Sequence, residues 1–330
     1  MNMNSVIETL KECIQKNIRL VPLIEGQPGV GKSSVIYQAA KALGLPVIEF
    51  RPANHGIEDL IGLPTFNEDK TKASYAIPDW LPNEERDGEK GILFIDEFMQ
   101  ANPAMQSALS QLIYDKRVHD YFLPKGWTIV AATNSSKHRA ATHKMPTHIA
   151  DRTVKVEAEF GLDAWLDWAY ATNLDPAIIA FAKWRPAVLD SFDPKLETNC
   201  TPRSLAACSE YMTMPDTIRN PLIQGTIGDG AAAELVGFLS VWTKLPDLDI
   251  ALKNPKLVTI PQEPDVLYAL TTALSHRANP QTMPAITQII ERVPNEFQVM
   301  FFKDATRRDQ KICTTAEFKT FLANNKELLA

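Results

Sequence analysis

Residues 23–35, LIEGQPGVGKSSV, decide the fold of this 330-residue chain. The apolar start is typical of the end of a buried strand, and the residues that follow have the pattern of a helix. Between the two, Gly26, Gly31, Lys32 and Ser33 fit the pattern G-x-x-x-x-G-K-[ST]. Glycines at these positions allow a tight turn whose backbone N–H groups point inward at a helix N-terminus. The stretch therefore predicts an anion-binding turn between a strand and a helix.

The anion that this pattern binds is a nucleotide phosphate chain. The Lys32 ammonium would neutralise the β- and γ-phosphates, and the Ser33 hydroxyl would face a Mg²⁺ ion. The predicted nucleotide-binding residues of the turn are Gly26, Gln27, Pro28, Gly29, Val30, Gly31, Lys32, Ser33 and Ser34.

A second stretch, ILFIDEF at residues 92–98, places two acids directly after four apolar residues. In a phosphate-loop protein, an aspartate at such a strand end holds Mg²⁺, commonly through a water molecule. The glutamate beside it can act as a general base on the attacking water. We therefore predict Ser33 and Asp96 as metal ligands and Glu97 as the catalytic base.

Three further polar residues are candidates for the same chemistry. Asn134 ends the apolar stretch TIVAATN, where an amide can orient the lytic water or contact the γ-phosphate; ordinary turn chemistry is the alternative. Arg152 and Arg203 are candidate stabilisers of phosphoryl charge, because a guanidinium is rigid and always protonated. The alternative for each arginine is a surface ion pair.

Apolar strand patterns alternate with helical patterns as far as about residue 160, and helical patterns dominate afterwards. This order predicts an α/β fold with a parallel sheet and helices on both faces, followed by a helical region. Residues 53–90 lack periodicity, so we expect loops and one short helix there. Residues 116–127, KRVHDYFLPKGW, have the pattern of a small hairpin.

Composition narrows the class of protein. A net charge of −6 disfavours a dedicated nucleic-acid binder, although it leaves room for a local basic strip. No apolar run approaches the 18 residues of a membrane span, so we expect a cytoplasmic protein without a membrane segment. The cysteines show no metal-ligand spacing and are expected to be reduced structural thiols. They are Cys13, Cys200, Cys208 and Cys313.

In order along the chain, the motifs resemble those of AAA+ ATPases, and most closely those of the MoxR-like branch. They span about residues 20–215, and after the glycine turn they are NHGIEDLIGLP, IDEFMQANPAMQSALSQLIYD, AATN, ADR and TPRS. The resemblance implies an AAA+ phosphate-loop core over residues 1–158 and an all-helical lid over 159–228. Residues 229–330 would be extra C-terminal helices.

The resemblance also implies roles for single residues. Asn134 would be sensor 1, and Arg152 would be an arginine finger that acts on ATP bound to a neighbouring subunit. Arg203 would be sensor 2 and would reach ATP in its own subunit from the lid. The hairpin near residues 115–127 would line the central pore of a ring. Because the segment before Arg152 departs from the family's usual pattern, Arg139 is an alternative finger.

The leading functional hypothesis is a hydrolase of ATP with Mg²⁺ as cofactor. It would act as a motor or chaperone that assembles into a homo-oligomeric ring, a hexamer, and remodels a protein partner. A von Willebrand factor A protein is a candidate partner by resemblance. One alternative is a nucleic-acid motor or loader of the helicase or clamp-loader kind. A second alternative is a nucleotide-gated binding protein with little turnover.

Overall fold

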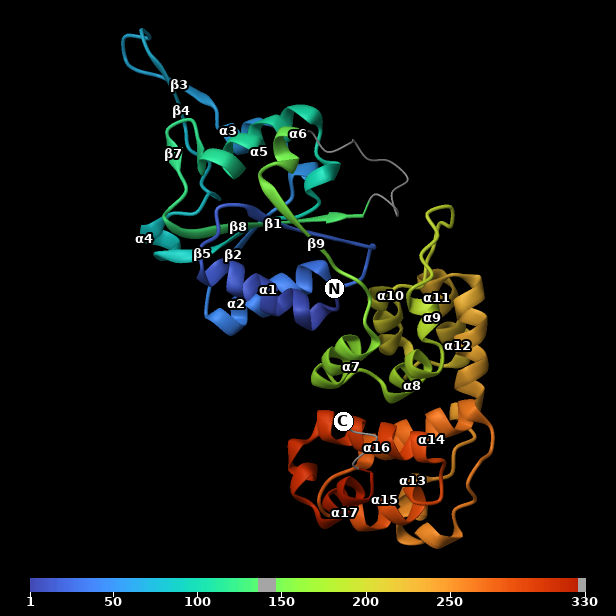
Figure 1. Ribbon diagram of the computed structural model, residues 1–330. Coiled ribbons are helices and arrows are strands. Elements are labelled where there is room, and N and C mark those ends of the chain that lie inside the picture. The colour runs from blue at the N-terminus through green and yellow to red at the C-terminus, as the bar shows by residue number, and fades with distance from the viewer. Residues whose placement is uncertain (136–146, 326–330) are drawn as a thin grey trace. The chain divides into compact units, whose positions relative to one another are not determined.

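The computed structural model describes residues 1–135 and 147–325 (Figure 1). The chain forms two compact units. The first comprises Met1–Gly161 with Asp193–Lys195, and the second comprises Leu162–Phe192 with Leu196–Ala330. The expected boundaries of core, lid and extension at residues 158 and 228 stay predictions.

A five-stranded parallel sheet forms the centre of the first unit, in the order β2-β5-β8-β1-β9. Its strands are β1 (Val21–Gly26), β2 (Val47–Phe50), β5 (Lys90–Ile95), β8 (Gly126–Asn134) and β9 (Thr153–Glu157). The central strands are almost continuously apolar and buried, as expected for a parallel sheet covered on both faces. This sheet confirms the predicted α/β class.

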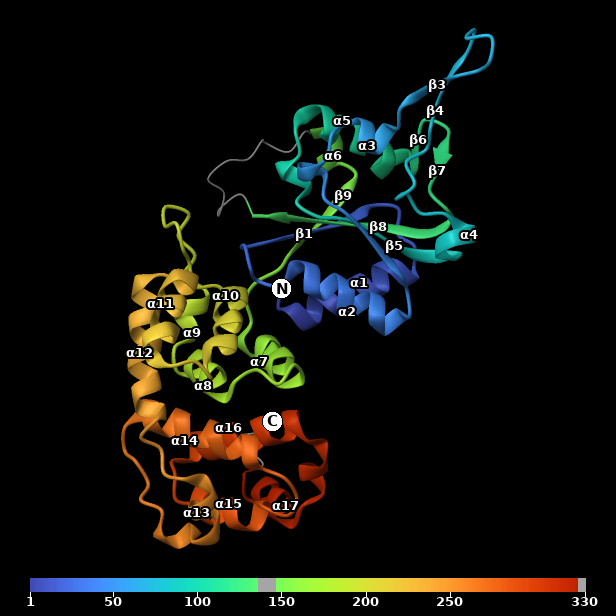
Figure 2. The same cartoon turned by 180° about the vertical axis from the view of Figure 1, so that it is seen from behind.

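Helices cover both faces of the sheet (Figures 1 and 2). One face carries α1 (Met3–Gln15) and α2 (Lys32–Leu43), and the other carries α3 (Glu58–Ile61), α5 (Pro103–Asp115) and α6 (Thr147–Ala150). In α1, Val6 and Leu10 are fully buried at the four-residue spacing that places both on one side of a helix. Burial of one apolar stripe thus docks the N-terminal helix.

The segment between β2 and β5 differs from its prediction. Instead of loops with one short helix, it holds the turn η1 (Pro52–Asn54), two short helices and a hairpin. The second short helix is α4 (Glu84–Asp87), and the hairpin pairs β3 (Pro64–Phe66) with β4 (Ala73–Tyr75). All six residues of the two strands are exposed, so no alternation of buried and exposed positions marks them in the sequence.

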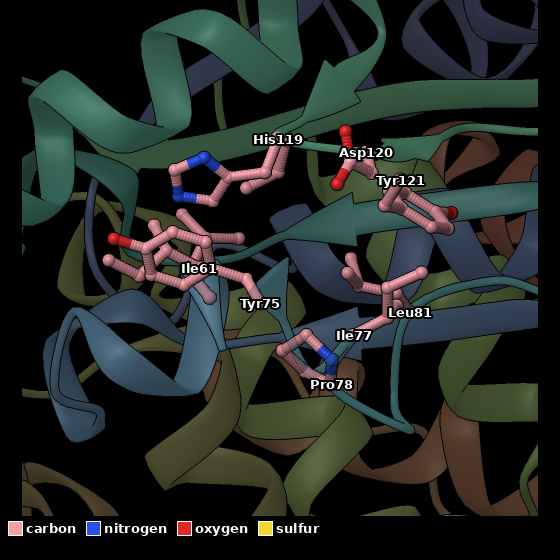
Figure 3. A pocket seen from close by; sticks show the side chains of 10 residues that line it. Ile61, Tyr75, Ile77, Pro78, Leu81, His119, Asp120 and Tyr121 are labelled. Carbon is pink, nitrogen blue, oxygen red and sulfur yellow. The ribbon is translucent and has the colours of Figure 1, made fainter. Parts of the chain in front are cut away.

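The second hairpin was predicted, and the structure confirms it. Strands β6 (Arg117–Val118) and β7 (Tyr121–Phe122) pair antiparallel across a two-residue turn. The ring of Tyr75, at the end of β4, stacks on the ring of His119 with centroids 4.1 Å apart (Figure 3). The two hairpins therefore lie side by side and are in direct contact.

The second unit is helical throughout its regular structure, as predicted for the region after the sheet. Its longer helices are α7 (Leu162–Ala171), α8 (Pro176–Trp184), α11 (Asp216–Ile227), α12 (Asp229–Trp242), α14 (Pro264–Arg277), α15 (Met283–Ile290), α16 (Asn295–Arg308) and α17 (Ala316–Asn324). Shorter ones are α9 (Pro186–Leu189), α10 (Pro202–Ala207) and α13 (Leu248–Lys253). Among the helices of the described ranges, none combines the length and apolar character that crossing a membrane requires.

A buried ion pair lies inside this unit. Lys183 on α8 pairs with Asp304 on α16, and their side chains are 4% and 1% exposed. Arg307 on α16 is within 3.5 Å of the same carboxylate and also pairs with Asp163 and Asp167 on α7. Three helices of the second unit are thus joined by charges, buried between α8 and α16 and exposed to water at the α7 carboxylates.

Candidate functional site

The glycine-rich turn lies at the carboxyl end of β1, where the strand passes into α2. Gly29 and Gly31 have φ angles of 74° and 106°, in the left-handed region that favours glycine. At Gly26 a Cβ atom would come within 2.6 Å of the Ala158 carbonyl oxygen, so the strand end also requires glycine. Helix α2 starts at Lys32 without a side-chain cap, which leaves its first N–H groups directed toward the turn.

The Lys32 side chain is buried and reaches back across this turn. Its Nζ donates to the carbonyl oxygens of Gly26 and Gln27 at 3.1 and 2.9 Å, and to Asn134 Oδ1 at 2.9 Å. A charged ammonium is therefore fixed over the turn by three oxygens. This is the position from which it can neutralise a bound phosphate chain.

Ser33 and Asp96 supply a pair of oxygen donors beside the turn. Ser33 Oγ donates to Asp96 Oδ2 at 3.2 Å. Asp96 directly follows β5, and its backbone N–H donates to the Phe50 carbonyl at the end of β2. Hydroxyl and carboxylate oxygens are the ligands that Mg²⁺ prefers, so this pair fits the predicted metal site.

Glu97 follows Asp96 with an uncommon backbone conformation. Its φ angle is 53°, in the left-handed region, and its N–H donates to Asp96 Oδ1 at 2.9 Å. A non-glycine residue in this region costs on the order of 1 kcal/mol and occurs often at functional sites. The strain and the bond to Asp96 fix where the Glu97 side chain leaves the main chain.

Asn134 is the last residue of β8 and lies directly opposite Gly26 in the parallel register. The neighbouring Ser135 N–H donates to the Gly26 carbonyl at 3.0 Å. The register thus brings the amide, the glycine turn and Lys32 together at one edge of the sheet. The carboxyl ends of β1, β5 and β8 meet there because the strands are parallel.

Arg152 lies at the opposite end of the same strands, beside the amino ends of β1 and β9. It directly precedes β9, and its carbonyl oxygen accepts the N–H of Val21, the first residue of β1, at 3.0 Å. Because β1 ends at the glycine turn after six residues, its length separates Arg152 from the turn by about 16 Å. Arg152 is therefore not part of the cluster of Lys32 and Asp96 in the same chain.

The remaining predicted residues are placed as follows. Arg203 is exposed in the first turn of α10 in the second unit, where Thr201 and Ser204 form a capping box. Pro28, Val30 and Ser34 lie in the glycine turn and at the start of α2, as predicted. The alternative finger Arg139 lies outside the described residues.

Arg51 also lies at this edge, although no motif in the sequence predicted it there. Arg51 follows β2, and its Nε lies 2.5 Å from Glu49 Oε1 and 3.9 Å from Asp96 Oδ2. The Tyr37 hydroxyl donates to Glu49, and burial together with that carboxylate raises the Tyr37 pKa to about 12. The signal that could have found Arg51 is its position just after a strand that neighbours β5.

Other metal chemistry has no counterpart in the described structure. Within residues 1–135 and 147–325, no group of three or more His, Cys, Asp or Glu side chains is arranged to hold a metal ion. The thiols of Cys200 and Cys208 are buried, and burial raises the pKa of both to about 12. Both are therefore protonated and unreactive near neutral pH, as expected for structural cysteines.

The carboxyl ends of one parallel sheet thus carry a glycine-rich turn, a lysine, a serine–aspartate pair and an asparagine. Residues 22–152 match the AAA domain, dynein-related subfamily. The matched segment runs from β1 to Arg152 and contains the glycine turn, Asp96, Glu97 and Asn134. The second unit lies outside it.

Several solved structures resemble the whole chain at low identity. A candidate ATPase from Cytophaga hutchinsonii is 14% identical, over 92% of this chain and 80% of that chain, with a TM-score of 0.38. RuvB of Thermotoga maritima, a Holliday junction branch migration motor, is 14% identical over 98% of this chain and 86% of that one, with a TM-score of 0.41. No curated protein matches the chain in sequence.

Proposed function

We propose that this protein is a Mg²⁺-dependent ATPase whose active site is completed by a second copy of the chain. One observation carries the proposal. At the carboxyl ends of the strands, Lys32 is hydrogen-bonded to Asn134 and Ser33 to Asp96, whereas Arg152 lies at the amino ends. The match of residues 22–152 to an AAA domain supports the same reading.

The residues at the carboxyl ends of the strands have separate roles in phosphoryl transfer. The glycine turn and Lys32 would bind the phosphates, and Ser33 and Asp96 would hold Mg²⁺, Asp96 through water. When bound, Mg²⁺ would supply positive charge beside the phosphates. Glu97 takes the proton of the attacking water, and Asn134 orients that water. Arg203 would contact the nucleotide from the helical lid of the same subunit.

Arg152 would act on the ATP of a neighbour. Its position beside the amino ends of β1 and β9 places it far from its own glycine turn. An interface that joins one end of a subunit to the other end of the next is head-to-tail, and such interfaces form a ring when the rotation between neighbouring subunits closes. We therefore propose a homo-oligomeric ring, a hexamer as in MoxR-like ATPases, in which each Arg152 serves the adjacent site.

The protein would use the free energy of ATP hydrolysis to remodel a protein partner. The support is the chemistry of the two hairpins that meet at Tyr75 and His119 (Figure 3). Phe66 on β3 and Phe122 on β7 are 64% and 63% exposed, and residues 64–75 and 117–122, the strands with their turns, together carry three acids and three bases. Exposed aromatic rings without an excess of basic residues are better suited to bind a polypeptide than the phosphate backbone of a nucleic acid. A von Willebrand factor A protein is one such partner.

The test is the rate of ATP hydrolysis per subunit as a function of protein concentration. We expect low turnover at dilutions where the chain is monomeric, and a rise as it assembles. Arg152→Ala is expected to assemble and bind ATP but to lack this rise. An Arg152→Ala assembly that hydrolyses ATP at the wild-type rate would contradict the shared site.

A further inference from the structure

Tyr114, in the last turn of α5, lies against two arginines from other parts of the chain. Its side chain is 49% exposed, and the Arg152 guanidinium carbon is 4.0 Å from the ring centroid. The guanidinium carbon of Arg19, which lies just before β1, is 5.9 Å from the same centroid. Both distances are within the range of a cation–π contact.

The three residues surround a cavity of about 230 Å³ at the surface of the first unit. It is lined by Arg19, Leu20, Ile113, Tyr114, Asp151 and Arg152. Two guanidinium groups and one carboxylate give the lining a net positive charge. The cavity is thus suited to an anionic group from outside the subunit.

The main chain at Arg152 is fixed by two hydrogen bonds. The N–H of Arg152 donates to the Ile149 carbonyl, and its carbonyl accepts the N–H of Val21. Four rotatable bonds join the guanidinium to that main chain, so its placement depends on the side chains that it contacts. The Tyr114 ring supplies a flat surface against which one placement is favoured.

We propose that Tyr114 is a positioning residue that holds the Arg152 guanidinium ready for the phosphates of ATP bound to a second copy of this chain. Arg19 adds a second positive charge at the same ring. This inference rests on the proposed function and adds two residues to the shared site. A guanidinium that is already in place loses less conformational entropy when the transition state forms. We therefore expect Tyr114 to raise kcat.

The first experiment compares Tyr114→Leu with Tyr114→Phe in the full chain. Leucine removes the aromatic face, and kcat is expected to fall about 3- to 30-fold with the KM for ATP unchanged. Phenylalanine keeps the face and is expected to stay within about twofold of wild type. Arg19→Gln should lower kcat by a smaller factor than Tyr114→Leu, because its guanidinium is farther from the ring centroid.

The second experiment asks where Tyr114 acts. A Lys32→Ala chain cannot use its own glycine turn but keeps Tyr114 and Arg152. Added to Tyr114→Leu chains, it is expected to raise their hydrolysis, whereas a Lys32→Ala/Tyr114→Leu chain is not. Recovery with both partners, or with neither, would overturn the positioning role in the neighbouring site.

Arg152→Ala separates this inference from the proposed function. If Arg152→Ala abolishes hydrolysis and Tyr114→Leu leaves kcat at the wild-type value, only the role of Tyr114 is wrong. If Arg152→Ala itself hydrolyses ATP normally, the shared site and the role of Tyr114 are both wrong. Tyr114→Leu could instead lower the melting temperature and leave kcat unchanged in the assembled protein. The aromatic ring of Tyr114 would then be a structural contact only.

Discussion

Lys32 and Asn134 are 102 residues apart in the chain, and Lys32 Nζ lies 2.9 Å from Asn134 Oδ1. The contact exists because β8 pairs with β1 in a register that places Asn134 opposite Gly26. It ties the phosphate-binding lysine to the residue expected to orient water. The two side chains nevertheless have different predicted roles, and substitution can separate them.

We expect Lys32→Ala to abolish measurable ATP binding, because the turn loses its only ammonium. Asn134→Ala should bind ATP within about threefold of wild type and lose about 100-fold in kcat, as expected when one preorganised polar group is removed. Titration with a fluorescent ATP analogue and steady-state hydrolysis measure the two effects. Equal loss of binding in both variants would contradict the separate roles.

Glu97→Gln is expected to bind ATP normally and to lose at least about 100-fold in turnover. The substitution keeps the shape of the side chain but removes the base. Glu97→Gly is a matched control, because glycine suits the φ angle of 53° and should not lower the melting temperature. It should nevertheless be inactive. Unchanged turnover in Glu97→Gln would remove Glu97 as the base.

The buried pair of Lys183 and Asp304 predicts a large effect on stability rather than on chemistry. Asp304→Ala leaves a buried ammonium without its partner and is expected to cost about 3–5 kcal/mol in chemical denaturation. Burial already lowers the Lys183 pKa. Glu12→Ala, which breaks the exposed pair of Glu12 with Lys16, is the control and should leave stability nearly unchanged. Similar losses in both variants would contradict the burial of the inner pair.

His276 on α14 predicts a loss of stability in acid. Burial, together with the nearby cations Arg308 and Lys183, lowers its pKa from 6.5 to about 4, against the opposing effect of Asp304. The unfolded chain therefore takes up a proton below pH 6.5 that the folded chain does not. The contribution of His276 to the free energy of unfolding is constant above pH 6.5. It falls by roughly 3 kcal/mol as the pH decreases to about 4.

His276→Gln should remove this part of the acid sensitivity. Denaturation of both proteins at pH 7 and at pH 4.5 checks the prediction. The difference between the two pH values is expected to be smaller in the variant. The same difference in both proteins would show that His276 is not the group responsible.

The long elements of the first unit could be predicted from the sequence. The strand and helix expected around the glycine-rich turn are β1 and α2, and the strand end expected at ILFIDEF is the end of β5. Their apolar periodicity reflects local packing that a single stretch reveals. Lys32, Ser33, Asp96 and Asn134 were predicted together because each belongs to a recognisable motif after a strand.

Relationships between distant segments could not be predicted in this way. The β3–β4 hairpin is exposed on both faces, so its sequence carries no alternation. The stack of Arg152 on Tyr114 and the pair of Lys183 with Asp304 join residues whose types are ordinary at their own positions. Only the fold brings them together. The same is true of Arg51 beside Asp96.

The most direct measurement is hydrolysis in a mixture of two inactive chains. Lys32→Ala keeps a working Arg152, and Arg152→Ala keeps a working glycine turn. Neither is expected to hydrolyse ATP alone. An equal mixture should regain about a quarter of the wild-type rate, since half of the subunits have an intact turn and half of those meet an intact arginine in a head-to-tail ring. A mixture that assembles and stays inactive would contradict the account that one subunit's arginine completes the site of the next.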